Sequence, residues 1–254
     1  MRLDQFLVDN KHFTSRSKAK EYIISEGVEI LNALTSETKI IKTPSYKITE
    51  NLTVNISFKE TPITKFVSRA GLKLEGAIEH LNLKVKDLSF LDVGISTGGF
   101  TDCLLQHGAE SIVGIDVGHD QLSQSLRADS RVTSIEGLNI KDLNDDEEFN
   151  KISQGKFDAC VVDVSFISLI HVIKSVVKYV RDDGFLLVLV KPQFEMGPSA
   201  LNKKGVIKNE SSYTLLEEKI RELFKNHDLK VLDYFSSSIK GKKGNKEFFI
   251  YAKK

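Results

Sequence analysis

The chain has 254 residues, of which 41% are hydrophobic, so it can bury the core of one large domain or of two smaller ones. Its 36 basic and 35 acidic residues leave a formal net charge of +1, so a nucleic-acid partner has to be argued from local clusters. Two cysteines exclude a disulfide scaffold. The sequence has no run of apolar residues long enough for a membrane span and no signal-peptide pattern, so we expect a cytoplasmic protein. The histidines and cysteines lack metal-ligand spacing, so no metal is predicted.

Residues 1–60 predict a small α+β domain. Two short amphipathic helices come first; the second has Thr14 or Ser15 as its cap and ends at Gly27, as a helix-terminating glycine should. A polar loop separates two runs with the composition of strands. These expected strands cover 28–31 and 52–58, and a proline-containing linker is expected at 61–68.

Residues 69–254 show helices and strands in alternation. The strands are almost continuously apolar, which is typical of a parallel sheet covered by helices on both faces. We therefore predict a Rossmann-like, doubly wound α/β domain with seven strands, of which the last pair is antiparallel. The expected strands are 90–93, 111–116, 132–136, 157–163, 184–191, 230–236 and 247–252, and the main helices are 71–83, 99–106, 167–179 and 211–226.

A glycine-rich loop, Gly94-Ile95-Ser96-Thr97-Gly98-Gly99-Phe100, follows the first strand of this domain and opens a helix. Glycines there let the backbone approach a ligand closely, and the start of a helix offers free amides. About twenty residues further on, Asp116 ends the second strand, where a carboxylate accepts ribose hydroxyls. The agreement of loop, strand and Asp116 favours a nucleoside cofactor over the alternative, an ordinary glycine turn.

Asp92, two residues before the first glycine, distinguishes between two classes of cofactor. A carboxylate so close to the loop would repel the pyrophosphate of a dinucleotide. It suits S-adenosylmethionine, which has an ammonium and a sulfonium but no phosphate. The expected cofactor contacts are Asp92, Gly94, Ser96, Thr97, Gly98, Gly99, Phe100, Asp116, Asn139 and Asp163.

Asp163 and Lys191 end the fourth and fifth strands, so both are expected at the edge of the sheet where α/β proteins bind ligands. Burying an unpaired charge is costly, so they should pair or face a cleft; the alternative is that both are solvated strand ends. A lysine among apolar walls and a second cation has its pKa lowered and acts as a base. Because a sulfonium methyl is already activated, the protein need only deprotonate and align a hydroxyl acceptor. The segment after the fourth strand lacks the Asn/Asp-Pro-Pro-aromatic pattern of amine methylases.

Five motifs occur in order along the chain: Asp92-Val93-Gly94-x-Ser96-Thr97-Gly98-Gly99-Phe100-Thr101-Asp102, Gly114-x-Asp116-Val117-Gly118, Asp163-x-Ser165-Phe166-Ile167-Ser168-Leu169, Lys191-Pro192-Gln193-Phe194-Glu195 and Gly244-Asn245-x-Glu247-Phe248. Together they resemble the TlyA (haemolysin A) family of rRNA 2′-O-methyltransferases, whose methylase domain is similar to the FtsJ enzymes. The resemblance implies methylation of ribose 2′-hydroxyls of ribosomal RNA, with ribosomal subunits as partners. It also implies a catalytic set consisting of Lys73, Asp163, Lys191 and Glu247. Lys191 would act as the base or as the group that orients the hydroxyl.

The first 60 residues resemble the alpha-L type RNA-binding domain shared with ribosomal proteins and pseudouridine synthases. The residues themselves predict a basic face that contacts phosphates, formed by Arg2, Arg16, Lys18 and Lys20. The alternative is an ordinary solvated helix face.

Ile95 departs from the family pattern, because a small residue is usual at this place in the cofactor loop. It predicts a crowded cofactor site and supports a rival function, a non-catalytic RNA-binding ribosome-assembly factor with a degenerate methylase fold. A second rival is the haemolysin that the older family name implies; the missing apolar span and secretion signal speak against it.

Overall fold

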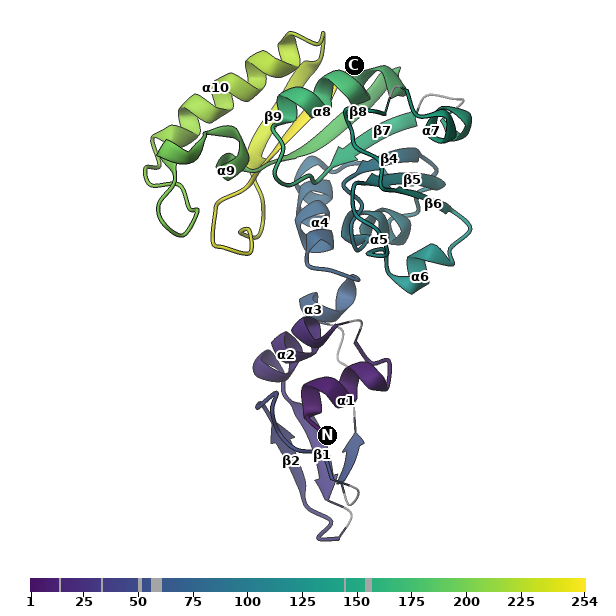
Figure 1. Cartoon of the computed structure of the whole chain (residues 1–254), viewed down its shortest axis with the longest axis vertical. Helices are drawn as coiled ribbons and strands as arrows, with labels where there is room; N and C mark the ends of the chain where they lie inside the picture. Colours follow the sequence, from purple (N-terminus) through teal and green to yellow (C-terminus); the bar gives the residue numbers. More distant parts are fainter. Residues whose placement is uncertain (14, 33, 50–51, 56–60, 144, 154–156) are drawn as a thin grey trace. The chain divides into compact units, whose positions relative to one another are not determined.

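The change of sequence pattern near residue 69 coincides with a division of the computed structural model into two units, Met1–Arg69 and Ala70–Lys254 (Figure 1). The structure describes the whole chain except residues 14, 33, 50–51, 56–60, 144 and 154–156. The predicted cap Thr14 and the last residues of the expected strand 52–58 therefore lie outside the described residues. The segment 61–68, expected to be a linker, falls within the first unit and contains a short helix, α3 (Pro62–Lys65).

The first unit packs two helices on a three-stranded antiparallel sheet. Ser15 caps the second helix by accepting a hydrogen bond from the amide of Lys18. Leu3, Leu7 and Ile23 of the helices are buried against Ile30 of the sheet. The elements are α1 (Leu3–Asp9), α2 (Arg16–Ser25), β1 (Val28–Asn32), β2 (Thr38–Ile41) and β3 (Leu52–Asn55), and the order of the strands in the sheet is β2-β1-β3. Strand β2 was not predicted, because it is short and its residues are largely exposed.

The second unit contains the predicted seven-stranded sheet, with the order β6-β5-β4-β7-β8-β10-β9. Neighbouring strands are parallel from β6 to β8, and β10 runs antiparallel to both β8 and β9. The prediction of a doubly wound α/β sheet with an antiparallel last pair is thereby confirmed. The strands are β4 (Ser89–Val93), β5 (Ser111–Asp116), β6 (Val132–Glu136), β7 (Phe157–Val162), β8 (Val180–Val190), β9 (Lys230–Ser236) and β10 (Phe248–Lys253).

Helices cover both faces of this sheet: α4 and α5 lie on one face, α8 and α10 on the other (Figure 1). The predicted helix 167–179 is divided, because Ser168 caps α8 and a 3-10 turn follows it. The helices are α4 (Ala70–Leu81), α5 (Gly99–Gln106), α6 (Gln124–Arg127), α7 (Glu147–Ile152), α8 (Leu169–Val176), α9 (Pro192–Glu195) and α10 (Ser212–Lys225), with 3-10 turns at Val177–Tyr179 and Pro198–Ala200. Helices α6 and α7 were not predicted; each has at most six residues, too few to show a helical period.

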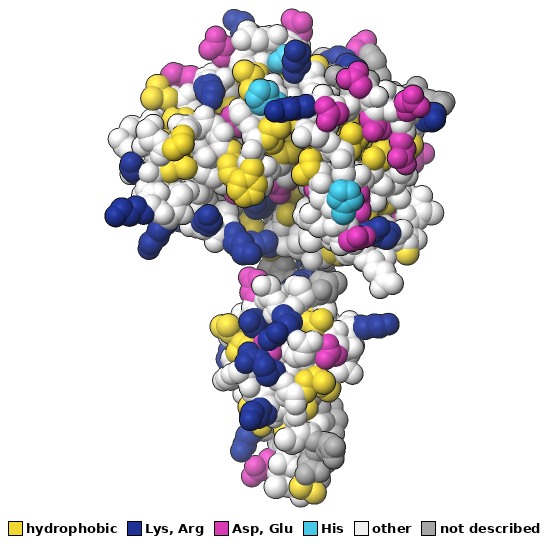
Figure 2. All heavy atoms as spheres, viewed as in Figure 1, with side chains coloured by type: hydrophobic (Ala, Val, Ile, Leu, Met, Phe, Trp, Pro, Cys, Tyr) yellow, Lys and Arg dark blue, Asp and Glu magenta, His cyan; other side chains and the backbone are white. Residues whose placement is uncertain are grey.

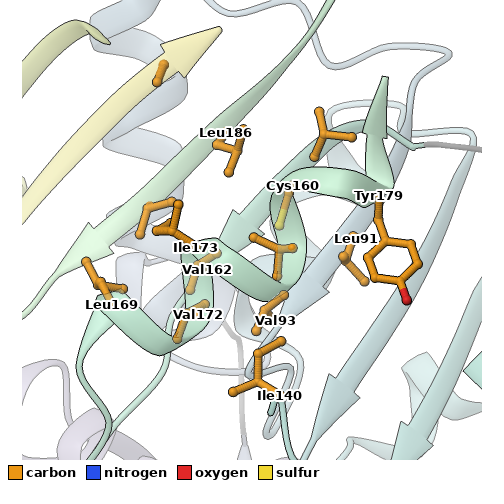
Figure 3. Close-up of a cluster of buried hydrophobic side chains, with 14 of the residues drawn as sticks. Leu91, Val93, Ile140, Cys160, Val162, Leu169, Val172, Ile173, Tyr179 and Leu186 are labelled. Carbon is orange, nitrogen blue, oxygen red and sulfur yellow. The ribbon is translucent and has the colours of Figure 1, made fainter. Parts of the chain in front are cut away.

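The core between the sheet and α8 consists of aliphatic side chains from both layers (Figure 3). Leu91 and Val162 of the sheet and Val172 and Ile173 of α8 are fully buried or nearly so. Each such side chain contributes about 1.5–3 kcal/mol relative to an exposed one. Cys160 lies in the same cluster, and burial raises the pKa of its thiol well above the usual value, so it is an apolar core residue.

The topology brings several chain segments to one edge of the sheet. Parallel strands β4 to β8 all end there, and the chain reverses its direction of winding between β4 and β7. Strand β10 runs the opposite way, so its first residues lie at this same edge. Ligands in open α/β sheets bind at such a reversal point. This edge therefore carries the candidate site.

Candidate active site

The glycine loop between β4 and α5 has left-handed backbone conformations, which glycine adopts readily. Gly94, Ser96 and Gly98 have φ angles of 88°, 46° and 91°. A Cβ atom at Gly94 would lie 2.6 Å from the carbonyl oxygen of Asp163, so a larger residue would collide with the main chain that follows β7. The loop therefore passes directly against the end of β7, and Gly98 caps α5.

Asp92 lies in the last part of β4 beneath this loop and is completely buried. Its Oδ2 accepts a hydrogen bond of 2.6 Å from the hydroxyl of Thr101, whereas its Oδ1 has no hydrogen-bond partner among the described residues. Burial raises the pKa of Asp92 to about 7, Thr101 opposes the shift, and the charge of Asp163 adds to it. A buried acid with one unused oxygen fits a ligand that carries a cation, which matches the predicted cofactor.

Asp116 ends β5 and joins two loops of the site. Its Oδ2 accepts from the amide of Ser96 at 2.9 Å and its Oδ1 from the amide of Gly118 at 2.7 Å. The hydroxyl of Ser96 in turn donates to Oε1 of Gln121 at 3.0 Å. Because an ionised carboxylate accepts about four hydrogen bonds, Asp116 retains acceptor capacity for ribose hydroxyls. Gln121 was not predicted, since it lies in a loop with no motif of its own.

Four other residues that are predicted to contact the cofactor differ in their exposure and in the atoms available to a ligand. Gly99 is buried at the start of α5 and Thr97 is exposed. Phe100 is 3% exposed and stacks on Phe249 with ring centroids 6.2 Å apart, so its side chain belongs to the core and only its main chain remains for a ligand. Asn139 is exposed, and its side-chain oxygen accepts from the amide of Lys141 at 3.1 Å.

The sequence predicts that Ile95 crowds the cofactor loop, but its side chain points to the neighbouring strand instead. Ile95 is 4% exposed and packs against Gly114 of β5, where a Cβ atom would lie 2.2 Å from Ile95 Cδ1. The missing side chain of Gly114 therefore makes room for the larger residue. This pairing removes the sequence feature that favoured a degenerate methylase fold.

Lys191 and Asp163 form the first of two ion pairs at the site. Lys191 follows β8 and Asp163 follows β7, and Nζ and Oδ1 are 2.5 Å apart. Lys191 also donates to the hydroxyl of Ser165 at 3.0 Å. Their side chains are only 11% and 13% exposed, which rules out freely solvated strand ends.

Lys73 and Glu247 form the second pair, with Nζ and Oε2 2.6 Å apart and side chains 9% and 3% exposed. Lys73 comes from α4, and Glu247 immediately precedes β10. Phe248 pairs with Val190 in the β10–β8 register, so the next positions, Glu247 and Lys191, lie side by side at the edge. The four residues of the predicted catalytic set therefore come together as two adjacent pairs.

Glu195 is a buried residue of this region that sequence reasoning missed. Its carboxylate accepts from the hydroxyl of Ser168 at 2.8 Å and from the amide of Leu169 at 2.9 Å, while Lys219 Nζ donates to its carbonyl oxygen at 2.7 Å. It thereby ties α9, which begins directly after Lys191, to the start of α8. Glu195 ends the motif that begins at Lys191, but its partners Ser168 and Leu169 are distant in sequence.

Phe166 is a second residue for which no sequence pattern indicates a role. It follows Ser165, has a φ of 65°, and is 91% exposed. Its ring centroid lies 5.1 Å from that of Phe194, which follows Lys191 by three residues. A bulky residue with positive φ is uncommon, and here it presents a flat apolar surface beside the Lys191–Asp163 pair.

In the first unit, three of the predicted RNA-binding cations surround one buried acid. Asp4 is fully buried, and its carboxylate is 2.9 Å from Arg2, 3.2 Å from Arg16 and 3.8 Å from Lys20. The hydrogen bond from Arg2, aided by Arg16, holds the pKa of Asp4 at about 2. Lys18 instead donates to the carbonyl oxygen of Phe66. Basic side chains gather on this unit in Figure 2.

The described part of the chain holds neither a cluster of metal ligands nor a helix suited to a membrane. Nowhere among these residues do three or more His, Cys, Asp or Glu side chains gather as metal ligands would. Likewise, none of the described helices combines the length and the apolar character that crossing a membrane requires.

The fold and the site define a class of protein: an α/β enzyme whose glycine loop and acids suit a nucleoside cofactor that carries positive charge. The family model of FtsJ-like methyltransferases matches residues 66–254. The chain is 38% identical to Hemolysin A of Brachyspira hyodysenteriae over 99% of both chains. It is 31% identical to the 23S rRNA (cytidine-2′-O)-methyltransferase TlyA of Campylobacter jejuni over 99% of this chain and 98% of that protein.

A solved structure of a Streptococcus thermophilus protein that carries the hemolysin name is also similar. It has a TM-score of 0.72 and 32% identity, with 100% of this chain and 88% of that chain covered. The chain belongs to the FtsJ-like methyltransferase family, and the predicted resemblance to the TlyA (haemolysin A) proteins is confirmed. S-adenosylmethionine is the methyl donor of FtsJ-like enzymes.

Proposed function

We propose that this protein transfers the methyl group of S-adenosylmethionine to ribose 2′-hydroxyls of ribosomal RNA, acting on ribosomal subunits in the cytoplasm. The observation that carries the proposal is the presence of two lysine–carboxylate pairs, one buried and one largely buried, at the same sheet edge as the Asp92 and Asp116 loop. Family membership and the named activity of the Campylobacter jejuni relative support it.

The cofactor would be held by the glycine loop and its two acids. The unused oxygen of Asp92 suits the ammonium of the amino-acid tail, and Asp116 suits the ribose hydroxyls. When bound, S-adenosylmethionine supplies a methyl group that the positive sulfonium already activates. The protein therefore has to bind the acceptor hydroxyl, align it and remove its proton.

We assign removal of the proton to Lys191. As the neutral amine, its Nζ would accept the 2′-hydroxyl proton while the oxygen takes the methyl group and the carbon–sulfur bond breaks, which leaves a neutral thioether. The Asp163 carboxylate would stabilise the resulting ammonium. The Ser165 hydroxyl fixes the position of Nζ. Lys73, held by Glu247, adds a positive charge that favours the oxyanion form of the acceptor. Both pairs are largely shielded from water, which strengthens these electrostatic effects.

RNA recognition would use features of both units. In the first unit, Arg2, Arg16 and Lys20 are anchored by Asp4 yet remain about half exposed, so each is able to contact a phosphate. In the second unit, the exposed ring of Phe166 suits an unstacked base, because chemistry on a nucleotide within a helix requires turning it out of the stack.

The test of the catalytic assignment is Lys191→Ala. We expect methyl transfer to ribosomal RNA to fall by about 10²–10⁴-fold or more, the usual contribution of a general base. The affinity for S-adenosylmethionine, measured by calorimetry, should be unchanged. Lys225→Ala, at the exposed end of α10, is a matched control. Mass-spectrometric mapping of ribose methylation, with and without the protein, identifies the modified nucleotide.

Three outcomes would contradict these assignments. A Lys191→Ala protein that methylates at the parent rate would show that Lys191 is not the base. A parent protein without saturable cofactor binding would indicate the non-catalytic assembly factor instead. Leakage of liposomes caused by the purified protein would favour the haemolysin.

A further inference from the structure

Two lysine-rich loops of the second unit come together beside the proposed active site. The first loop, residues 202–208, follows the turn Pro198–Ala200, and the second loop, residues 240–246, immediately precedes Glu247. Residues 202–210 and 240–247 together hold seven lysines against two glutamates. In a chain that is nearly neutral as a whole, this is a marked local concentration of positive charge.

A buried asparagine joins the two loops. Asn245 of the second loop is only 2% exposed. Its side-chain nitrogen donates to the carbonyl oxygen of Gly205 at 2.9 Å, and its side-chain oxygen accepts from the amide of Ile207 at 3.2 Å. Its carbonyl oxygen accepts from the amide of Gly241 at 2.9 Å. The side chain of Asn245 therefore links the second loop to the first, and its carbonyl oxygen closes the second loop.

The first loop is also fixed internally. The side-chain oxygen of Asn202 accepts from the amides of Lys204 at 2.8 Å and Val206 at 3.1 Å, and its carbonyl oxygen accepts from Gly205 at 2.9 Å. Such side-chain hydrogen bonds to the following backbone stabilise tight turns. The loop's own hydrogen bonds therefore hold the backbone that carries Lys203 and Lys204.

The second loop reaches the catalytic carboxylate directly. Gly241 is buried, and a Cβ atom there would lie 2.3 Å from Oε1 of Glu247. Lys243 Nζ lies 4.0 Å from the place that a Cβ on Gly205 would take, so a lysine of the second loop extends over the first. Basic side chains gather at the lower left of the second unit in Figure 2, where Figure 1 shows two loops below the labels α9 and β9.

The lysines of the two loops differ in whether they form an ion pair or a hydrogen bond within the protein. Lys246 pairs with Glu210 at 2.5 Å, and Lys208 donates to the carbonyl oxygen of Ser199 at 3.0 Å. Four further lysines of the two loops are exposed and make no ion pair with a carboxylate in the part of the chain that the structure describes. These are Lys203, Lys204, Lys242 and Lys243. Clustered like charges repel one another, and a polyanion relieves that repulsion.

We propose that this lysine surface, formed by Lys203, Lys204, Lys242 and Lys243, binds the phosphate backbone of the RNA strand next to the nucleotide being methylated. The inference rests on the proposed function and adds a docking surface to it. Lysine ammonium groups act as point charges toward phosphates, so the contacts position the strand without reading its sequence. The contact of Gly241 with Glu247 places the docked strand beside the reacting groups.

The experiment measures how binding of an unmodified ribosomal RNA transcript depends on salt. Two double variants, Lys203→Gln with Lys204→Gln and Lys242→Gln with Lys243→Gln, each remove two phosphate contacts. We expect each to weaken binding severalfold and to reduce the slope of log Kd against log salt concentration by about 1.4–1.8, from about 0.7–0.9 per contact. The matched control is Lys225→Gln with Lys230→Gln, at the end of α10 and the start of β9, which should leave the slope unchanged.

Kinetics distinguish docking from catalysis. Both lysine variants should keep kcat at saturating RNA and raise KM for RNA, whereas Lys191→Ala should keep the salt slope and lose methyl transfer. Salt slopes equal to that of the parent would overturn the lysine surface while the proposed function stands. Lysine-dependent binding to vesicles of anionic lipid, with an unchanged slope for RNA, would overturn it in favour of a membrane surface. A parent that binds RNA through these lysines but transfers no methyl group would instead overturn the proposed function.

Discussion

Ile95 and Gly114 show that a residue in the cofactor loop has to be judged together with the position it packs against. Ile95 looks out of place in the linear sequence, but its side chain fills the space left by a glycine on the neighbouring strand. The contact is specific enough to test, because any side chain at Gly114 would displace Ile95.

Gly114→Ala should therefore destabilise the protein and weaken cofactor binding. The added methyl group overpacks a buried site, which costs about 1–3 kcal/mol of unfolding free energy. Adding Ile95→Ala to Gly114→Ala should recover part of the loss, because it vacates the same space. Urea denaturation and cofactor calorimetry of the single and double variants measure the coupling. Strictly additive effects would mean that the two side chains do not compete.

We expect Asp92 to make cofactor binding dependent on pH. Its pKa in the free protein is about 7, raised first by burial and further by the charges of Asp163 and Asp116. A cationic ligand favours the ionised carboxylate, so below pH 7 binding has to expel a proton. We expect the affinity for S-adenosylmethionine to fall as the pH decreases below about 7, by up to about tenfold per pH unit.

The control for this prediction is Asp92→Asn, which cannot ionise. It should bind the cofactor more weakly and show a flatter dependence on pH, as measured by calorimetry over a series of buffers. Equal pH dependence in the parent and the variant would assign the effect to another group.

Among the secondary-structure elements, α8 and α9 act as a connected pair. Helix α9 begins directly after Lys191, and α8 begins after the short loop that carries Asp163. Glu195 joins the two helices by accepting from Ser168 and Leu169. The distance between the Lys191 and Asp163 side chains therefore depends on a contact made several residues away.

Glu195→Ala should lower both stability and kcat. It leaves the buried amide of Leu169 without its acceptor, at a cost of about 1–3 kcal/mol in unfolding free energy. It also frees Lys191 from its fixed distance to Asp163, so kcat should fall while the cofactor affinity remains. Glu195→Gln keeps an acceptor for Leu169 and should restore most of kcat. The exposed Glu222 of α10 provides a control, Glu222→Ala. If Glu195→Ala lost stability but kept kcat, Glu195 would have only a structural role.

The elements also show what the sequence was able to predict. The common location of the glycine loop, Asp116 and the ends of β7 and β8 was predictable, because the carboxyl ends of parallel strands meet at one edge of the sheet. The short elements β2, α6 and α7 were not, because they are too short to show a period. The outward ring of Phe166, the inward ring of Phe100 and the partner of Glu195 depend on contacts between segments distant in sequence. No local pattern records such contacts.

For the molecule as a whole, a net charge near zero conceals separate basic areas. One surrounds Asp4 in the first unit, and the other is the lysine surface in the second. Their chemistry differs: the first holds its cations on a buried carboxylate, and the second leaves four ammonium groups without such a partner among the described residues. A whole-chain charge is therefore a poor guide to nucleic-acid binding, and the distribution of charge is what matters.

The pairing of Lys73 with Glu247 also bears on how the protein folds. These two residues come from the first helix and the last strand region of the second unit, so their contact spans almost the entire unit in sequence. Contacts of such long range form slowly, because closing a large loop costs chain entropy before the contact can stabilise the structure. Recovery of enzymatic turnover during refolding should therefore lag behind recovery of helical content. The length of this lag would measure how long Lys73 and Glu247 take to come together.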